Sequence, residues 1–333
     1  MTPRYALIVS LLLVAVTDLL RSEELPKLTT LSDASIKYAV PSKPYVVLRG
    51  GDVEAVIVDN QAADDEVLPG HRAGYSGVAS LKHAKQKRNI FVPLYAGLNY
   101  EHIHDGTVQH RDILFEPRRA SLKLRVVNDR IAELYQAPTP HWGLESCLRY
   151  ELLDDGAIEM TLECIPHRKT FANGYIGLFW ASYINQPESL DIHLKGYSAG
   201  SDNAQWLRGV TPKHGVLSTH VGTNDKRQFK HAEDFPLTLA FNRSRYRYAE
   251  PWYYGVSHGM ALAFVFRDQD MARLTQSPSG GGQGNPAWDF QYFFSDYKVG
   301  QRYQAVMRAL YVPFESREQM EKATKPHRDA LRL

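Results

Sequence analysis

The sequence has almost no net charge, few cysteines and no long apolar run beyond its first residues. Its 39 basic and 37 acidic side chains give a formal net charge of +2 over 333 residues. This balance argues against the basic surface with which proteins bind nucleic acid or anionic membranes. The glycine-rich segment 279–286 lacks the lysine of a phosphate-binding loop, so we interpret it as a flexible loop suited to cover a site. After residue 21, no segment is long and apolar enough to span a bilayer.

The rest of the composition is that of an ordinary globular protein with a surplus of aromatic side chains. Hydrophobic residues make up 44% of the chain and charged residues 23%. A chain of this length folds as one large β domain or two smaller domains. The 19 Tyr and five Trp are many for a plain core, and several lie beside polar residues in the sequence. This enrichment favours a ligand-binding surface.

Residues 1–21 have the features of a secretory signal peptide. Arg4 provides a short positive region, and residues 6–16 form an apolar stretch too short to span a bilayer comfortably. We therefore expect a single β-sandwich domain over residues 22–333 and a secreted or periplasmic location. The alternative is an N-terminal membrane anchor that is not cleaved.

The two cysteines are placed to form a disulfide bond, which export permits. Residues 144–165 have the pattern of two strands joined by a turn at Asp155-Gly156. If these two residues alone form the turn, Cys147 lies directly opposite Cys164, at a position where cross-strand side chains approach most closely. The sequence therefore predicts a Cys147–Cys164 disulfide. The alternative is a pair of buried free thiols in contact.

Short runs of β-forming residues recur about every ten residues along the chain, with turn signals between them. This spacing predicts an all-β fold, a large two-sheet antiparallel sandwich. Residues 260–266 are apolar throughout, which predicts a strand buried on both faces. A short helix is expected near the C-terminus, where Ser316 and Gln319 form a capping-box pattern and Pro326 ends it.

The segment before the buried strand combines aromatic and ionisable side chains. It contains Glu250, Trp252, Tyr254 and His258, and its proline and glycines predict a loop that enters the sheet. Aromatic rings cover the apolar C–H faces of a sugar, while ionisable groups bind hydroxyls or move protons. The segment is thus a candidate sugar-binding site. The alternative is a packed aromatic edge without a ligand.

A second candidate is a pair of histidines separated by one residue. His102 and His104 point to the same face of a strand, because side chains alternate with a period of two. With Glu101 or Asp105 nearby, they fit a site for zinc or another divalent metal. They fit equally well a metal-free role, as acid and base or in binding a uronate carboxylate. Solvated or core histidines are the third alternative, and no other cofactor is indicated.

A third candidate is the glycine-rich segment around His71, where the backbone can approach a ligand closely. Its side chains His71, Arg72 and Tyr75 are suited to hold an anionic sugar. An exposed glycine-rich turn is an equally good interpretation. Tyr95 is a further aromatic candidate, and Trp142 offers either a stacking ring or a core side chain.

The hairpin over residues 148–163 resembles that of galactose mutarotase-like proteins, the aldose 1-epimerase superfamily. Proteins of this superfamily have a similar strand, Asp-Asp-Gly turn and strand, and segment 288–303 is similar to their C-terminal end. The resemblance implies a large antiparallel sandwich whose concave face handles carbohydrate. Glycosidases and polysaccharide lyases also use this fold.

The chain departs from the epimerases of that superfamily, which open the sugar ring with histidines and a late glutamate. Their histidine motif is missing from residues 171–177, and Asp289 and Gln291 stand where the glutamate is expected. This departure weakens the case for simple mutarotase chemistry.

Together, these patterns predict a secreted enzyme that acts on a sugar or polysaccharide in a concave cleft lined by aromatic side chains and histidines. We expect a set of catalytic and binding residues to converge there, with hydrolysis, elimination and epimerisation all left open. The alternative function is a non-catalytic carbohydrate-binding or cell-surface module. The expected catalytic residues are His71, His102, His104, His258 and Glu250, and the expected binding residues are Arg72, Tyr75, Tyr95, Trp142, Trp252 and Tyr254.

Overall fold

The computed structural model describes residues 25–26 and 28–332. The predicted signal peptide over residues 1–21 lies outside the described residues. Within the described part of the chain, no helix is both long and apolar enough to cross a membrane.

Strands dominate the described structure, and the helices are few and mostly short. The strands are β1 (Tyr45–Gly50), β2 (Val53–Val58), β3 (Gly77–His83), β4 (Asn99–His104), β5 (Leu122–Asn128), β6 (Ile131–Gln136), β7 (Leu144–Leu152), β8 (Ile158–Pro166), β9 (Tyr175–Ala181), β10 (Ile192–Tyr197), β11 (Gln205–Gly209), β12 (Thr219–Gly222), β13 (Arg243–Ser257), β14 (Met260–Phe266), β15 (Arg273–Ser277), β16 (Ala287–Ser295) and β17 (Tyr303–Pro313). The helices are α1 (Arg111–Leu114), α2 (Glu116–Arg119) and α3 (Arg317–Ala330), with short 3-10 turns η1 (Thr238–Ala240) and η2 (Asp268–Asp270).

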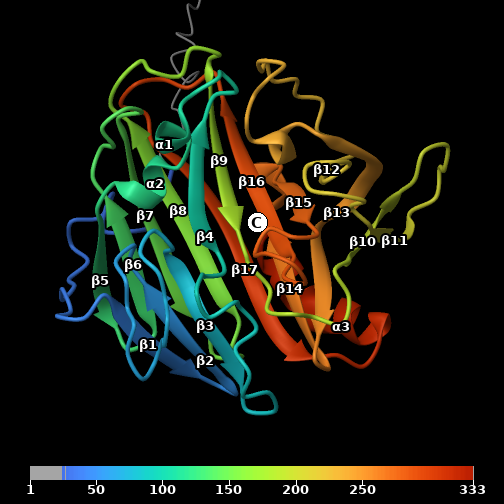
Figure 1. The fold of residues 1–333 in the computed structure, drawn as a ribbon, viewed down its shortest axis with the longest axis horizontal. Helices are drawn as coiled ribbons and strands as arrows, with labels where there is room; N and C mark the ends of the chain where they lie inside the picture. The colour runs from blue at the N-terminus through green and yellow to red at the C-terminus, as the bar shows by residue number, and fades with distance from the viewer. Residues whose placement is uncertain (1–24, 27, 333) are drawn as a thin grey trace, which may run out of the picture.

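One sheet of 14 strands forms the body of the molecule and folds over into two layers (Figure 1). Its main path runs β4-β9-β16-β15-β12-β13-β14-β17-β8-β7-β6-β5. The long strand β13 forms the corner, because its first half pairs with β12 and its second half pairs with β14. The prediction of a large all-β sandwich is confirmed.

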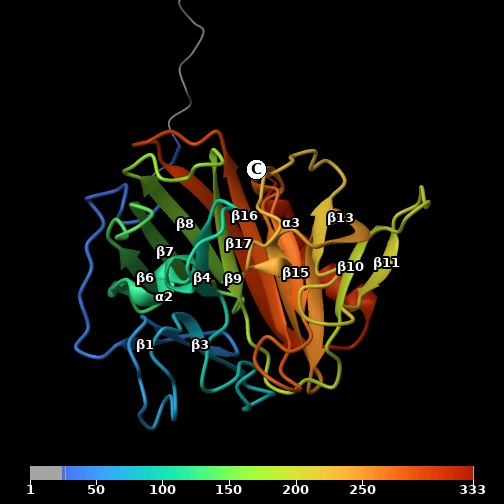
Figure 2. The ribbon, with the colours of Figure 1, turned by 45° about the horizontal axis from the view of Figure 1, so that its top comes forward.

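A smaller sheet of three strands, β1-β2-β3, lies against one end of the sandwich (Figure 2). There β3 lies next to β4 and β17, and β1 lies next to β7. The β10–β11 hairpin extends from the opposite side of the molecule, where β10 pairs with β13.

The main core lies between the two layers. Trp180 is fully buried and its ring stacks on Tyr100 on one side, 4.9 Å between centroids, and on Phe290 on the other, 5.4 Å. Burial of rings of this size contributes a large share of the apolar stabilisation. Along β4, β9 and β16, these core-facing residues alternate with residues whose side chains lie on the opposite, outer face of the layer. Side chains from both layers fill the core, including Leu148, Leu162, Leu178, Phe264, Tyr292 and Met307.

The expected C-terminal helix is present as α3, and Ser316 caps it by accepting a hydrogen bond from the Gln319 N–H at 3.1 Å. It is longer than predicted, because it continues through Pro326 to Ala330.

The predicted Cys147–Cys164 disulfide is wrong, because the β7–β8 register differs by one residue. The loop between the strands spans residues 153–157 instead of two residues, so Cys147 pairs with Glu163, and Ser146 pairs with Cys164. The two thiols therefore point to opposite faces of the sheet. Both cysteines are free and buried.

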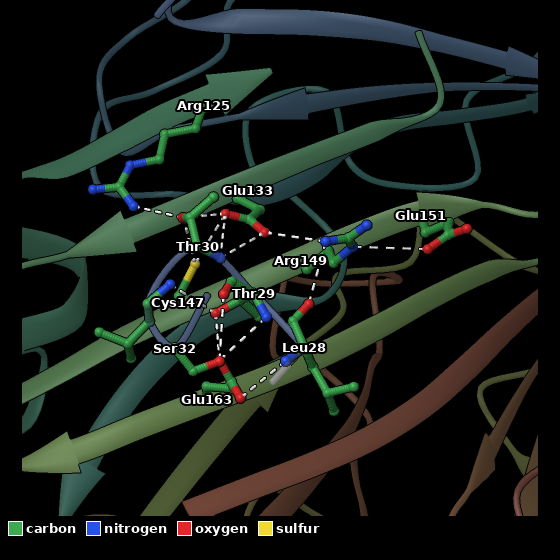
Figure 3. A network of polar contacts seen from close by, with 11 residues as sticks. Leu28, Thr29, Thr30, Ser32, Arg125, Glu133, Cys147, Arg149, Glu151 and Glu163 are labelled. Carbon is green, nitrogen blue, oxygen red and sulfur yellow. Dashed lines mark hydrogen bonds and ion pairs between the residues drawn. The ribbon is translucent and has the colours of Figure 1, made fainter. Parts of the chain in front are cut away.

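Two buried glutamates on the outer face of β6 and β8 bind the first described residues of the chain (Figure 3). Glu163 accepts hydrogen bonds from the Thr29 N–H at 3.2 Å and hydroxyl at 2.6 Å and from the Ser32 hydroxyl at 2.6 Å. Glu133 accepts from the Thr30 N–H at 3.2 Å. Both glutamates are 0% exposed. We call residues 28–32 the N-terminal strap. The strap thus provides hydrogen-bond donors to two carboxyl groups that burial removes from water.

We expect both cysteines to be free thiols in the purified protein, whether or not it has been exported. Reaction with Ellman's reagent in denaturant, without reductant, should detect two thiols per chain. In the folded protein the reaction should be very slow, because burial raises the pKa of both thiols. Absence of reactive thiols in the denatured protein would contradict this register.

Glu163→Gln should destabilise the fold by about 3 kcal/mol, because the amide presents donors to the N–H and O–H groups of the strap. Urea unfolding measures the change in the free energy of unfolding. The matched control is Asp154→Asn, whose side chain is 100% exposed; its effect should stay within about 0.5 kcal/mol. Equal effects of the two substitutions would show that the strap is not held through Glu163.

Candidate functional site

A β-bulge in β4 places two ionisable side chains on the face turned away from the main core. Tyr100 pairs with Trp180 and His102 pairs with Phe179, so Glu101 is the extra residue. Tyr100 and Ile103 both face the core, and the bulge leaves two residues between them. As a result, Glu101 and His102 both line one cavity on the other face.

The cavity has a volume of about 350 Å³ and is enclosed by β4, β9, β16 and the short helices α1 and α2. Its polar and aromatic lining comes from elements far apart in the sequence. The residues that line it are Tyr75, Glu101, His102, Arg111, Leu114, Phe115, Arg118, Phe179, Ala181, Tyr183, His214, Pro236, Leu237, Leu239, Ser277, Gly280, Ala287 and Asp289. The glycine-rich segment predicted as a covering loop thus contributes Gly280.

Glu101 is buried and held by two donors. The Tyr183 hydroxyl donates to its Oε1 at 2.5 Å, and the Arg118 guanidinium donates to the same atom at 3.0 Å. Its Oε2 lies 3.8 Å from His102 Nε2. Burial raises the pKa of Glu101, and the positive charge of Arg118 opposes this rise.

Asp289 is the second buried carboxyl group of the cavity, on β16 between the core residues Trp288 and Phe290. It is 1% exposed and accepts a hydrogen bond from the Ser182 N–H at 3.1 Å. Burial raises the pKa of Asp289 well above the usual range of a carboxyl group, and the nearby charge of Glu101 adds to the rise. Asp289 therefore keeps its proton to a higher pH than an exposed aspartate.

The two histidines of β4 share one face, as the alternation of side chains predicts, but have different surroundings. His102 lines the cavity between Phe115 and Phe179, with ring centroids 4.2 and 5.4 Å away. Burial, and secondarily His104, lowers the pKa of His102 well below its usual value, so its ring is neutral.

His104 lies beyond the cavity lining, in a cage of aromatic rings that includes Phe235, Phe241 and Phe293. Burial lowers the pKa of His104 to about 3. Its ring fits against Gly177, where a Cβ atom would lie 2.5 Å from the imidazole. Among the described residues, no group of three or more His, Cys, Asp or Glu side chains is arranged to hold a metal ion.

Tyrosines form the aromatic wall of the cavity. Tyr75 packs against Tyr95 and Tyr183, with ring centroids 4.6 and 5.8 Å away, and Tyr95 packs against Tyr183 at 5.0 Å. The Arg118 guanidinium lies over the Tyr75 ring at 3.9 Å. Tyr75 therefore lines the cavity, and Tyr95 supports it from behind.

The predicted residues His71 and Arg72 do not line this cavity. His71 is buried in the segment that leads to Tyr75. Arg72 is exposed, and its backbone N–H donates to the Leu94 carbonyl at 3.2 Å. Trp142 is a core residue that stacks on Phe171 at 4.7 Å.

The segment with Glu250, Trp252, Tyr254 and His258 is not the predicted loop and lies outside the cavity. It is part of the continuous strand β13 and the turn that follows. Trp252 and Tyr254 are buried in a hydrophobic cluster that includes Met320 of α3. Glu250 accepts hydrogen bonds from the Trp252 indole N–H and from Arg328. Alternating side chains of a long strand are buried by its neighbours, so these rings cannot form a ligand surface.

His258 occupies the β13–β14 turn with a φ of +53°. Its backbone N–H donates to Glu188 at 2.7 Å, and its Nδ1 lies 2.9 Å from the Ser257 hydroxyl. Residues 255–259 match the Gly-x-Ser-x-Gly pattern of hydrolases. However, they join two strands, whereas the hydrolase elbow joins a strand to a helix. The predicted convergence of His258 with His71 and His102 is therefore not found.

Sequence reasoning missed the residues that complete the cavity. Arg118 lies in a short helix with no strong pattern, and Tyr183 follows the end of β9. Tyr183 continues the alternation of Phe179 and Ala181 on the cavity face, which was the one available signal. Asp289 was noted for its place near the C-terminal end, but nothing in the sequence indicated its burial.

The fold of this chain resembles that of several solved structures, but no related sequence was found. No protein-family model matches the chain, and no curated protein matches it. A solved structure of a candidate aldose 1-epimerase from Escherichia coli K12 aligns with 81% of this chain and 99% of its own, with a TM-score of 0.47 and 9% identity. The Slr1438 protein from Synechocystis sp. PCC 6803 aligns with 84% of this chain and 99% of its own, with a TM-score of 0.46 and 8% identity.

A third similar structure is the heparan sulfate lyase HepC from Pedobacter heparinus. It aligns with 84% of this chain but only 37% of its own, with a TM-score of 0.40 and 11% identity. The function has to be judged from the cavity itself.

Asp289→Asn should change the pH dependence of stability. The folded protein holds the Asp289 proton to a higher pH than the unfolded chain does, so this group lowers stability increasingly as the pH rises above about 4. The variant should therefore gain stability over the wild type as the pH rises above about 4, by at most about 1.4 kcal/mol per pH unit. Urea unfolding at several pH values measures the difference. A difference that does not vary with pH would show that Asp289 titrates normally.

Proposed function

We propose that this protein is a carbohydrate-active enzyme whose active site is the cavity between Glu101 and Asp289. The proposal is supported chiefly by one observation: two buried carboxyl groups with different partners line the same cavity beside tyrosine rings. Carboxyl pairs whose pKa values are separated by their surroundings are typical of acid–base catalysis on sugars.

The size and lining of the cavity suit a sugar unit. About 350 Å³ lies within the range of small-molecule sites. The rings of Tyr75 and Phe179 can cover the apolar faces of a pyranose, and the edges carry His102 and His214 to bind hydroxyls. His214 is itself oriented by a 2.7 Å hydrogen bond between its Nδ1 and the Ser277 hydroxyl.

The two carboxyl groups are suited to complementary roles. Glu101 is the base, because Arg118 and Tyr183 stabilise its ionised form while burial brings its pKa upward. Asp289 is the acid, because it retains its proton. Glu101 takes a proton from the sugar, and Asp289 delivers one to an oxygen of the ring or of the glycosidic bond. The neutral His102, 3.8 Å from Glu101, is placed to pass a proton on.

The alternative of a non-catalytic binding module predicts aromatic rings along an open face. Trp142, Trp252 and Tyr254 are instead at most 1% exposed, which favours the enzyme. The N-terminal sequence supports a location outside the cytoplasm, where polysaccharides are available.

A panel of neutral and acidic saccharides tests the proposal. The purified protein is incubated with each, and three products are followed: new reducing ends, ultraviolet absorbance of unsaturated uronates, and anomer exchange in proton NMR spectra. One of these signals is expected with at least one saccharide. Binding without any turnover would favour the module, and the absence of both would contradict the proposal.

Glu101→Gln and Asp289→Asn should each lower kcat by about 100-fold or more with the saccharide that is turned over, because each removes a proton-transfer group. The matched control is Glu250→Gln, which makes the same change as Glu101→Gln outside the cavity, and His258→Ala is a second control outside the cavity; both should retain activity. Equal losses in both sets would place the chemistry elsewhere.

A further inference from the structure

A second cavity continues the first along the short helices α1 and α2. It has a volume of about 870 Å³ and shares the residues Arg111, Phe115 and Arg118 with the first. Its remaining lining is Asn60, Gln61, Ala62, Ala73, Gly74, Arg119 and Ser121. The shared residues make the two cavities neighbouring parts of one groove, with room for more than a single sugar unit.

The charged side chains that line the second cavity are all positive. Three arginines line it, and no carboxylate does. Arg118 is occupied, because it binds Glu101 and donates to the Gly74 carbonyl at 2.7 Å. Arg119 pairs with Asp112, but both side chains are about half exposed, and an exposed ion pair of this kind adds little stability.

Arg111 is the guanidinium that remains available at the junction of the two cavities. Within the described part of the chain, no ion pair involves Arg111, and its guanidinium lies 4.8 Å from the centroid of Phe115. The ring of Phe115 and the fixed side chain of Arg118 form one wall of the groove. Asn60 fixes the wall further by donating to the carbonyl of Ala120 at 2.6 Å. A guanidinium presented in this way is suited to bind a carboxylate or sulfate group through two hydrogen bonds.

We propose that the substrate is an anionic oligosaccharide, an inference that rests on the proposed function of the first cavity. One sugar unit occupies the cavity of Glu101 and Asp289. The carboxylate or sulfate group of the adjoining unit binds to Arg111, and Arg119 contributes after it releases Asp112. The groove thereby selects acidic glycans over neutral glycans of the same length.

Calorimetric titration of the full chain tests the inference with four probes of equal length. These are a galacturonate trisaccharide, its methyl ester, a sulfated galactose trisaccharide and a neutral galactose trisaccharide. The anionic probes should bind at least about tenfold more tightly than the two uncharged ones, and the preference should weaken at high salt. A preference for the galacturonate identifies a uronate site, and a preference for the sulfated probe identifies a sulfate-ester site.

The variant Arg111→Gln should remove about tenfold or more of the affinity for the anionic probes and leave the uncharged probes unaffected. Arg49→Gln is the matched control, because Arg49 is an exposed arginine paired with Glu54 on the small sheet. Equal binding of charged and uncharged probes, unchanged by Arg111→Gln, would overturn this inference while leaving the proposed function intact. Binding of none of the probes, together with an inactive saccharide panel, would overturn both. Thermal unfolding of each variant establishes that the fold is retained.

Discussion

The cost of burying carboxyl groups on one face of a β-sheet governs the arrangement of the site. Glu101 and Asp289 lie on the cavity face of the same layer, where water cannot solvate them freely. Glu101 is compensated by Arg118 and Tyr183, whereas Asp289 has the backbone N–H of Ser182. The two groups differ in how readily they ionise because their hydrogen-bond partners differ, more than because their burial differs.

This requirement extends outward from the carboxyl groups into the fold. Arg118 reaches Glu101 because α2 packs beside β4 and because Gly74 offers its carbonyl to the guanidinium. The bulge in β4 turns Glu101 toward the cavity while Tyr100 and Ile103 stay in the core. The stack of Tyr100, Trp180 and Phe290 behind them provides a rigid support. One face of β4, β9 and β16 therefore packs in the core, and the other face carries the residues of the cavity.

Local patterns predicted the fold better than they predicted the site. Regular strand spacing was sufficient for an all-β sandwich, and alternation correctly placed His102 and His104 on one face. The disulfide prediction failed on a one-residue difference in strand register, which moves the side chains of one strand to the opposite face relative to its partner. The prediction of a sugar-binding loop at Trp252 and Tyr254 failed because local composition does not show that α3 covers them.

The residues of the cavity were hard to find for a related reason. Arg118, Tyr183 and Asp289 come from three distant segments, and each looks ordinary among its sequence neighbours. Their roles arise from the pairing of β4 with β9 and of β9 with β16, and from the packing of α2 beside β4. Strand order in a sheet of this size is a long-range property, so it cannot be read from periodicity.

The N-terminal strap joins the first and last parts of the described chain. Glu163, which binds Thr29 and Ser32, also accepts a hydrogen bond from Gln304 of β17 at 2.6 Å, and Arg302 donates to the Leu25 carbonyl. A ribosome completes β17 long after it has made the strap. The strap can therefore dock on Glu133 and Glu163 once β8 has been made, whereas the hydrogen bond from Gln304 to Glu163 forms only when nearly the whole polypeptide is present.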